Sequence, residues 1–271
     1  MLLDKSRIER FTLKPFQVIE NRRIAEGIYI IRLRPVTNTS RGFFDALKPF
    51  MFFNIWVPRV DELPLSIAYV DNDSIYFLYR VRGEGTGTLS TKSSGSFVGL
   101  KGPLGVGYEP SAGERILAIV GGIGIAPIPL LIKKSVDVEA YVDVFWGVRS
   151  SKEFFDLVKV FNLPHSGWRL VKASEDCLEG VCGTVLDAVR GVNIDGYDAV
   201  IAVGPNEMLK AFCETFGNKK ENIYVSLETV VKCGLGICGS CYIKGTNKLL
   251  CVDGPLFKCS EVMEHLKSLN S

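Results

Sequence analysis

The sequence predicts an antiparallel β-barrel, then an α/β domain with a parallel sheet, then a small cysteine-rich subdomain. Three observations predict this order. Short strands bounded by Pro, Gly, Asp or Asn fill residues 16–113, apolar strands alternate with helical segments over 114–227, and four cysteines cluster between 233 and 251. Closely spaced short strands are typical of a barrel, and strand–helix alternation is typical of a parallel sheet. We therefore expect three domains, at 1–113, 114–227 and 228–271.

The barrel strands are predicted from period-two hydrophobicity. Tyr29, Ile31 and Leu33 alternate with a second row that becomes polar toward Arg34, as in a half-buried strand. Aromatic and β-branched runs with the same boundaries follow. We expect strands over 29–34, 50–57, 65–70, 75–81 and 96–100.

The second region predicts a nucleotide site at one edge of a sheet. The expected strands are 115–120, 141–146, 168–173, 199–203 and 223–227, and the expected helices are 127–135, 152–161, 185–190 and 206–216. The turn Gly121-Gly-Ile-Gly-Ile-Ala-Pro127 follows the first strand, and Gly147 and Gly204 end later strands on the same edge. Such glycines let backbone approach a phosphate. The turn is not a Gly-x-Gly-x-x-Gly fingerprint, so an ordinary tight turn is the alternative.

Composition and charge exclude several function classes. The 271 residues carry 32 basic and 30 acidic side chains, a net charge of +2, which provides no broad field for nucleic acid or an anionic membrane. Charged side chains interrupt Met1–Phe16, so we expect no signal peptide and a cytoplasmic protein. The longest uncharged run, 116–132, is shorter than the ~20 residues of a membrane span.

The cysteine cluster is the strongest functional signal. Cys233, Cys238 and Cys241 have the spacing Cys-x4-Cys-x2-Cys, and Cys251 follows after nine residues. This spacing is typical of plant-type 2Fe-2S sites, in which thiolates hold two irons. Interleaved glycines at 234, 236 and 239 supply the positive φ angles and close N–H groups that such a loop needs.

A structural zinc is the alternative for these four residues. Zinc ribbons usually pair two Cys-x2-Cys turns, however, and this chain has one. The remaining cysteines do not share the pattern. We expect Cys177, Cys182, Cys213 and Cys259 to be free cysteines that act as small buried hydrophobes.

Three segments of the barrel region, in order, suggest a flavin site. They are Pro64-Leu-Ser-Ile67, Leu78-Tyr-Arg-Val81 and Gly83-Glu-Gly-Thr-Gly-Thr-Leu-Ser90. Singly they indicate a turn, a core strand and a loop. Together, a strand with polar backbone, a basic strand and a turn that opens a helix can hold an isoalloxazine ring and its diphosphate.

Taken together, these motifs resemble the ferredoxin reductase superfamily, most closely the electron-transfer subunits of dihydroorotate dehydrogenase B, the PyrK type. The resemblance runs from about Phe16 to the end. Its sharpest element is Ser226-Leu-Glu-Thr-Val-Val-Lys-Cys-Gly-Leu-Gly-Ile-Cys-Gly-Ser-Cys241 with Leu250-Cys-Val-Asp-Gly-Pro-Leu-Phe257.

The resemblance implies a ferredoxin reductase-like fold and assigns site residues. It implies that the flavin ring of FAD lies against Pro64, Leu65, Ser66, Leu78, Tyr79 and Arg80, and the diphosphate against Gly85 and Thr86. It further implies NAD at Gly122, Gly124 and Pro127, and a 2Fe-2S cluster on Cys233, Cys238, Cys241 and Cys251. No catalytic side chain is implied.

The implied function is an electron relay in pyrimidine biosynthesis. A partner subunit oxidises dihydroorotate at its FMN, and electrons pass through the cluster and FAD to NAD+, in a heterotetramer of two subunits of each kind. Only two histidines are present, and no Ser/His/Asp or Cys/His arrangement is visible, which also favours a relay over acid/base catalysis.

The chain departs from the family at two positions. Leu63 stands where the family usually has Arg before Pro-x-Ser, which leaves FAD and FMN both open, and Val203 stands where the superfamily often has Cys, which leaves nicotinamide use open. Arg149 is too generic to choose between NAD and NADP. Other functions also remain open. They are a subunit of another flavin/2Fe-2S oxidoreductase of the sulfhydrogenase or transhydrogenase type, a self-contained NADH reductase, and a non-catalytic redox-sensing or zinc-stabilised module.

Overall fold

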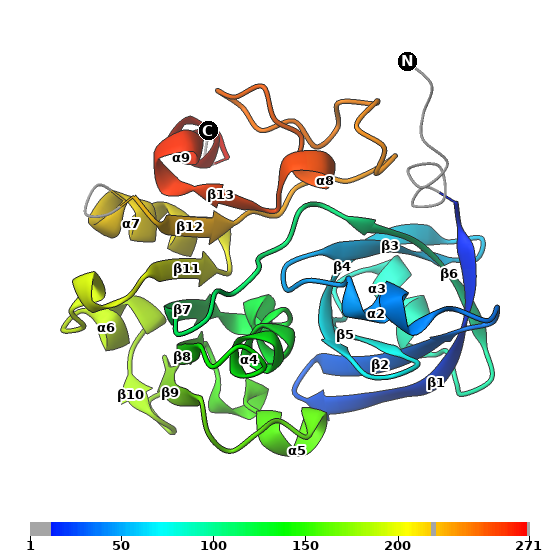
Figure 1. The fold of residues 1–271 in the computed structure, drawn as a ribbon, viewed down its shortest axis with the longest axis horizontal. Coiled ribbons are helices and arrows are strands. Elements are labelled where there is room, and N and C mark those ends of the chain that lie inside the picture. Colours follow the sequence, from blue (N-terminus) through cyan, green and yellow to red (C-terminus); the bar gives the residue numbers. More distant parts are fainter. Residues whose placement is uncertain (1–11, 218–220, 270–271) are drawn as a thin grey trace.

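The protein consists of a β-barrel beside an α/β sheet, with the cysteine-rich segment lying across both (Figure 1). The computed structural model describes residues 12–217 and 221–269. Most of the N-terminal stretch in which we expect no signal peptide therefore lies outside the described residues. Within the described residues, no helix is both long enough and apolar enough to cross a membrane.

Six antiparallel strands close the barrel in the order β1-β2-β5-β4-β3-β6. Closure follows because β1 pairs with both β2 and β6. Inward side chains such as Phe53, Ile55 and Phe77 form the barrel core. The elements are β1 (Lys14–Ala25), β2 (Ile28–Pro35), α2 (Arg41–Asp45), β3 (Phe52–Val57), β4 (Asp61–Val70), β5 (Ile75–Arg80), α3 (Glu84–Ser90) and β6 (Phe97–Leu104).

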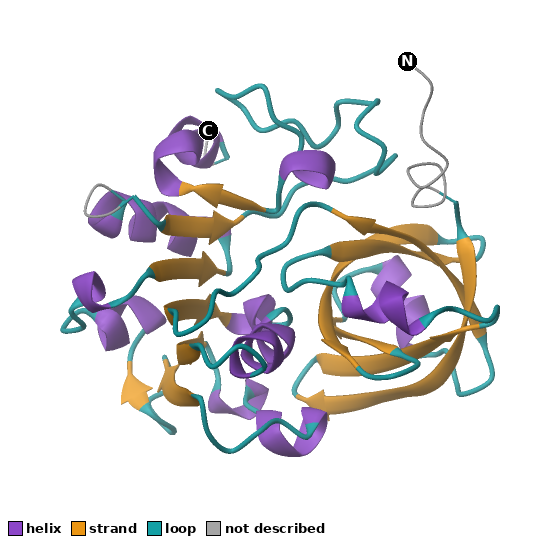
Figure 2. Ribbon diagram, viewed as in Figure 1, coloured by secondary structure: helices purple, strands orange, loops and turns teal. Residues whose placement is uncertain are grey.

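The second sheet has the order β10-β9-β8-β7-β11-β12-β13, parallel except for β13 (Figure 2). Its strands are β7 (Arg115–Gly121), β8 (Tyr141–Val148), β9 (Trp168–Ser174), β10 (Val181–Cys182), β11 (Ala199–Val203), β12 (Ile223–Ser226) and β13 (Leu256–Lys258). Its helices are η1 (Gly122–Ile125), α4 (Ile128–Val136), η2 (Ser151–Glu153), α5 (Leu157–Phe161), α6 (Val185–Val189), η3 (Ile194–Gly196), α7 (Asn206–Phe216), α8 (Leu250–Asp253) and α9 (Cys259–Ser268).

Both faces of this sheet are buried at its central strands, which explains why β11 and nearly all of β7 are apolar. Alternate residues of β7 face opposite cores: Ile116 packs with α4 and α5 on one side, and Leu117 packs with α6, α7 and α9 on the other. The barrel packs on the first face through residues such as Ile28 and Leu78. The tail shares the second core, so it does not depend on a core of its own.

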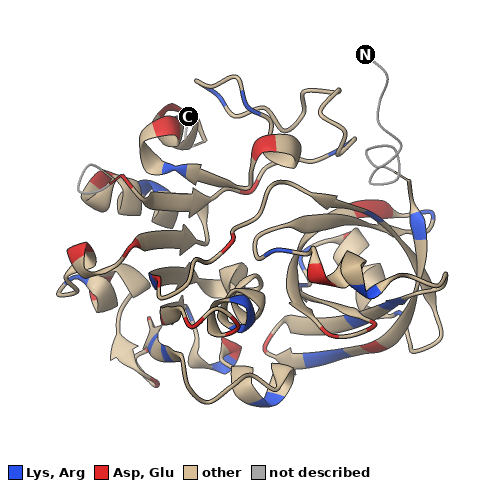
Figure 3. Ribbon diagram, in the orientation of Figure 1, with Lys and Arg blue, Asp and Glu red and all other residues tan. Residues whose placement is uncertain are grey.

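The predicted fold class is confirmed, with local differences. The strand β1 is absent from the prediction because its half-exposed, charged middle hides the period-two pattern. The predicted helix 152–161 is wrong over its first half, where η2 and an extended stretch precede α5. There Asp156 caps α5 by accepting a hydrogen bond from the Lys159 N–H. Figure 3 shows both signs of charge scattered over barrel and sheet, in keeping with the small net charge.

The expectation of four free buried cysteines outside the cluster is wrong. Cys177 pairs with Cys182, and Cys213 pairs with Cys259. The first pair is exposed in the loop between β9 and β10. The second is buried between α7 and α9 and closes a loop with a sequence separation of 46. Sequence spacing does not reveal the second pair, because its cysteines lie far apart in the sequence and meet only in the fold.

We expect the Cys213–Cys259 bond to stabilise the chain more than the Cys177–Cys182 bond. Closing a loop of 46 residues removes more freedom from the unfolded chain than closing one of 5, about 4 kcal/mol against about 2 kcal/mol. The double variants Cys213→Ala/Cys259→Ala and Cys177→Ala/Cys182→Ala, compared by denaturant unfolding, measure the difference. Equal losses from the two variants would contradict this expectation.

Candidate functional site

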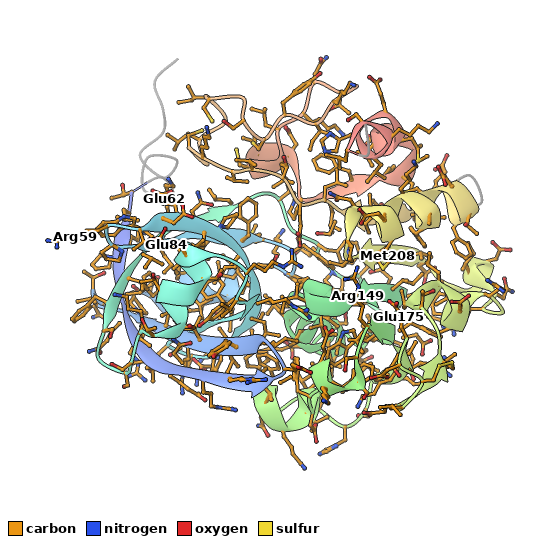
Figure 4. The ribbon with its side chains drawn as sticks, turned by 180° about the vertical axis from the view of Figure 1, so that it is seen from behind. Arg59, Glu62, Glu84, Arg149, Glu175 and Met208 are labelled. Atoms are coloured by element: carbon orange, nitrogen blue, oxygen red, sulfur yellow. A yellow bond between two sulfur atoms is a disulfide. The ribbon has the colours of Figure 1, made fainter. Side chains whose placement is uncertain are left out.

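A cavity of about 670 Å³ opens at the carboxyl ends of the central strands, where the sequence predicts a nucleotide site. Gly121 and Gly122 after β7, Gly147 in β8 and Gly204 after β11 all line it. The prediction that these glycines share one sheet edge is confirmed. Figure 4 shows three further lining side chains, Arg149, Glu175 and Met208, on the sheet side of the molecule.

The glycines serve two physical roles in this cavity wall. A Cβ on Gly124 would lie 2.6 Å from the Val203 carbonyl oxygen, and one on Gly147 would lie 2.7 Å from Val185 Cβ, so both positions need glycine for packing. Gly122 differs, because its φ is +53° and a Cβ there would meet open space. Gly122 is therefore the position where backbone is most accessible to a ligand.

Pro127 has a different position from Gly122 and Gly124. The two glycines line the cavity, whereas Pro127 is buried, is not part of the cavity wall and precedes α4. Its fixed φ suits the start of a helix. Pro127 therefore supports the turn 121–126 from the buried side, where the turn joins α4.

The barrel contributes a basic side chain to the same cavity. Arg80, at the end of β5, forms an ion pair with the buried carboxylate of Glu153 from η2. Within the described residues the buried Arg80 Nε has no hydrogen-bond partner. Arg80 itself lines the cavity, so the barrel places a positive charge at its junction with the sheet, where a ligand that spans both would lie.

The other residues predicted to contact a flavin differ in exposure. Pro64 is exposed, and Leu65 and Ser66 are half-buried on β4. Leu78 and Tyr79 are buried, and the Tyr79 hydroxyl donates to Asn21 Oδ1 at 2.8 Å. Burial raises the pKa of Tyr79, so its hydroxyl stays protonated. Of the three predicted residues on β5, only Arg80 therefore has a side chain accessible to a ligand.

The turn before α3 is held by its own side chains. Thr86 Oγ1 accepts hydrogen bonds from the N–H groups of Arg82 at 2.9 Å and Gly83 at 3.2 Å. Gly85 is buried, and a Cβ there would lie 2.9 Å from Leu63 Cδ2. Leu63, which replaces the family's Arg, thus packs under this turn.

The four remaining cysteines are all free thiols on one irregular loop and the following helix α8. Gly234, Gly236 and Gly239 have φ angles of +69°, +74° and +73°, so the predicted left-handed conformations are present. Gly236 and Gly234 also pack closely, against Val252 and Leu104. The loop can wrap around a bound group only with this backbone.

The thiols form two pairs. Cys241 Sγ and Cys251 Sγ are buried and lie 3.3 Å apart. Cys238 is exposed, and hydrogen bonds from Ser240 and then Cys233 lower the pKa of its thiol to about 6. Burial raises the pKa of Cys251 to about 12. Among the described residues, no three His, Cys, Asp or Glu side chains converge on one point, as a single metal ion requires.

Hydrogen bonds tie the cysteine-rich segment to the barrel and to the chain that leaves it, close to the first cysteine of the set and close to the last. The Gly105 N–H donates to the Cys251 carbonyl at 3.0 Å, and the Val106 N–H donates to the Gly254 carbonyl at 2.7 Å. Asn54 Nδ2 on β3 donates to the Lys232 carbonyl, one residue before Cys233, at 3.4 Å. The sequence gives no signal for Asn54, because it is an isolated polar residue in an apolar strand.

Comparison with known proteins identifies the tail and then the whole chain. Residues 228–263 match the family model for the iron-sulfur cluster binding domain of dihydroorotate dehydrogenase B. The chain is 31% identical over 262 residues to the dihydroorotate dehydrogenase B (NAD(+)) electron transfer subunit of Bacillus pumilus, covering 90% of this chain and 96% of that protein. It is 33% identical over 216 residues to the probable corresponding subunit of Archaeoglobus fulgidus, covering 79% and 87%.

Solved structures agree on the fold. One match is the structure of the NADH-dependent reduced ferredoxin-NADP oxidoreductase, which was determined to study flavin-based electron bifurcation. It superposes with a TM-score of 0.77 at 25% identity, over 95% of this chain and 94% of that one. The ferredoxin reductase of carbazole 1,9a-dioxygenase gives a TM-score of 0.67 at 19% identity, over 79% and 68%. With a ferredoxin reductase fold and near full-length relatives above 30% identity, the chain belongs to the family of dihydroorotate dehydrogenase B electron transfer subunits.

Proposed function

We propose that this chain is the electron-transfer subunit of a dihydroorotate dehydrogenase complex, passing electrons from the FMN of a catalytic partner through a 2Fe-2S cluster and FAD to NAD+. When bound, a flavin exchanges electron pairs with a nicotinamide and single electrons with an iron-sulfur cluster, so the chain would convert between the two. The observation that carries the proposal is the attachment of the four-thiol loop to the barrel that bears the predicted flavin strands.

The three predicted domains then have separate tasks. Residues 1–113 would hold FAD at Pro64, Leu65, Ser66, Leu78, Tyr79 and Arg80, with Gly85 and Thr86 at its diphosphate. Residues 114–227 would hold NAD at Gly122 and Gly124. Residues 228–271 would hold the cluster on Cys233, Cys238, Cys241 and Cys251. Arg80 and Arg82, which line the cavity from the barrel side, support an anionic ligand at the junction of the first two.

The partner's docking surface in this proposal surrounds the thiol loop. Cys238 is exposed, its chain neighbour Ile237 is 79% exposed, and Val230 and Val252 in the same cysteine-rich segment are 63% and 48% exposed. Exposed apolar side chains gathered around a redox group favour a protein contact there. An FMN-containing catalytic subunit in a heterotetramer would cover this surface.

The decisive experiment uses the native complex, isolated anaerobically through a tag on this chain. Visible absorption is recorded before and after addition of dihydroorotate. Bleaching of flavin and iron-sulfur bands supports the proposal. A coloured complex that stays oxidised assigns the relay to another donor, and a colourless protein contradicts the relay itself.

A second candidate is a subunit of another flavin/2Fe-2S oxidoreductase of the transhydrogenase type. The structural match to the NADH-dependent reduced ferredoxin-NADP oxidoreductase over 95% of this chain favours it. The absorption experiment on the native complex distinguishes the two candidates. If the second one is right, NADPH bleaches the flavin and iron-sulfur bands and dihydroorotate does not.

The variant Cys238→Ser is expected to lose the cluster and keep the flavin. Cys238 is one of the four free thiols of this loop, and it lies far along the chain from the flavin strands. Electron paramagnetic resonance of the reduced protein and flavin absorption measure the two outcomes. Cys177→Ser is the control and should keep both. A full 2Fe-2S signal in Cys238→Ser would reject the ligand assignment.

Glu228 is expected to make nucleotide binding pH-dependent. It lines the cavity, where the surrounding protein raises the pKa of its carboxyl by desolvation while the Arg82 charge lowers it. Below that raised pKa the carboxyl is neutral, and above it the carboxylate repels a pyrophosphate. NADH affinity should therefore fall as the pH rises through the raised pKa.

Titration calorimetry across the pH range tests this expectation. Glu228→Gln should bind NADH about tenfold more tightly at high pH, ~1.4 kcal/mol, and remove the pH dependence. Glu207→Gln also removes a carboxylate from the cavity wall but keeps Glu228, so it should leave the pH dependence in place. An unchanged pH profile in Glu228→Gln would contradict this role.

A further inference from the structure

A polar group of three side chains lies on the outer face of the barrel, beneath the thiol loop. Along β3, Phe53 and Ile55 point into the barrel core, so Asn54 between them points outward. Its cross-strand partners are Pro64 on β4 and Lys101 on β6. An outward side chain is normally accessible to water, yet Asn54 is 0% exposed. The thiol loop is what covers it, at Lys232.

The buried amide of Asn54 connects a charge pair to the loop. Its Nδ2 donates to Glu62 Oε2 at 3.2 Å and to the Lys232 carbonyl at 3.4 Å. Lys101 Nζ pairs with the same Glu62 oxygen, and the Lys101 side chain is only 13% exposed. Figure 4 labels Glu62 at the barrel side of the molecule. Within the described residues Asn54 Oδ1 has no partner, so Asn54 is held by its two donated bonds alone.

This polar group also touches the residue after the first thiol. A Cβ on Gly234 would lie 3.7 Å from Lys101 Cε and 2.9 Å from Leu104 Cδ1. The peptide before Cys233 is therefore hydrogen-bonded to the barrel through Asn54, and Gly234 after it lies beside the side chains of Lys101 and Leu104. A backbone fixed on both sides of a ligand fixes the direction of its sulfur.

We propose that Asn54, Glu62 and Lys101 are positioning residues that fix Cys233 against the flavin barrel and set the reduction potential of the cluster. This rests on the proposed function. Asn54 also lies opposite Pro64 on the predicted flavin strand β4. A short route therefore connects that strand to Cys233: the cross-strand pair Pro64–Asn54, the hydrogen bond from Asn54 to the Lys232 carbonyl, and the peptide unit that joins Lys232 to Cys233.

Because Glu62 and Lys101 carry opposite charges, the proposal predicts that removing each one shifts the reduction potential of the cluster in the opposite direction. Reduction adds negative charge to a cluster, so a nearby positive charge favours the reduced form and a negative charge disfavours it. Glu62→Gln leaves Lys101 uncompensated and should raise the potential. Lys101→Met leaves Glu62 uncompensated and should lower it. A purely structural role predicts no such pair of opposite shifts.

The experiment is a redox titration of the purified holoprotein, chemically reduced and followed by the electron paramagnetic resonance of the cluster. Matched controls come from the exposed pair Arg34 and Asp73 on the same barrel: Asp73→Asn and Arg34→Met should leave the potential unchanged. Asn54→Leu removes the two donated hydrogen bonds but keeps the size of the side chain, and it should change the line shape of the cluster's electron paramagnetic resonance spectrum. Asn54→Gln keeps an amide donor at this position, so its spectrum should lie closer to that of the wild type.

The outcomes separate this inference from the proposed function. Opposite shifts in Glu62→Gln and Lys101→Met, with unmoved controls, support the inference even if Asn54→Leu fails to fold. A wild-type cluster whose potential does not move in either charge variant overturns the inference and leaves the relay intact. A wild-type holoprotein without a 2Fe-2S signal overturns the relay and the inference together.

Discussion

The backbone pairing of Gly105 and Val106 with Cys251 and Gly254 is the constraint on which the arrangement of the molecule depends. These two residues follow β6, where the chain leaves the barrel for the sheet. A Cβ on Gly105 would lie 2.4 Å from the Gly254 carbonyl oxygen, so only glycine allows this approach. Through this short contact the segment that connects the barrel to the sheet is tied to the thiol loop.

The cavity depends on a second junction, between Arg80 and Glu153. Removing either partner of a buried ion pair leaves an uncompensated charge, and this costs more than the pair contributes. Here the charged groups come from β5 of the barrel and η2 of the sheet domain. The ion pair therefore fixes the relative position of two elements that each supply part of the cavity wall.

Local sequence patterns predicted the parts of the site that depend on local backbone. The thiol spacing and the glycines of the loop, the Gly-rich turn after β7 and the strands of the parallel sheet all have such patterns, and the structure brings them to the expected places. Asn54, Glu153 and Glu228 have no local pattern, because each acquires its environment from a segment far along the chain. The Cys213–Cys259 disulfide, with a sequence separation of 46, escaped prediction for the same reason.

The Cys213–Cys259 bond encloses all four cluster thiols within a single covalent ring. With or without the bond, the chain between Cys241 and Cys251 limits how far these two thiols can separate when iron is lost. The ring additionally excludes extended conformations of the segment that it encloses, so it raises the effective concentration of each thiol near the others. The four thiols can therefore come together again after iron loss without leaving this ring. A single backbone cut between Cys241 and Cys251 would also leave the two fragments joined by the disulfide.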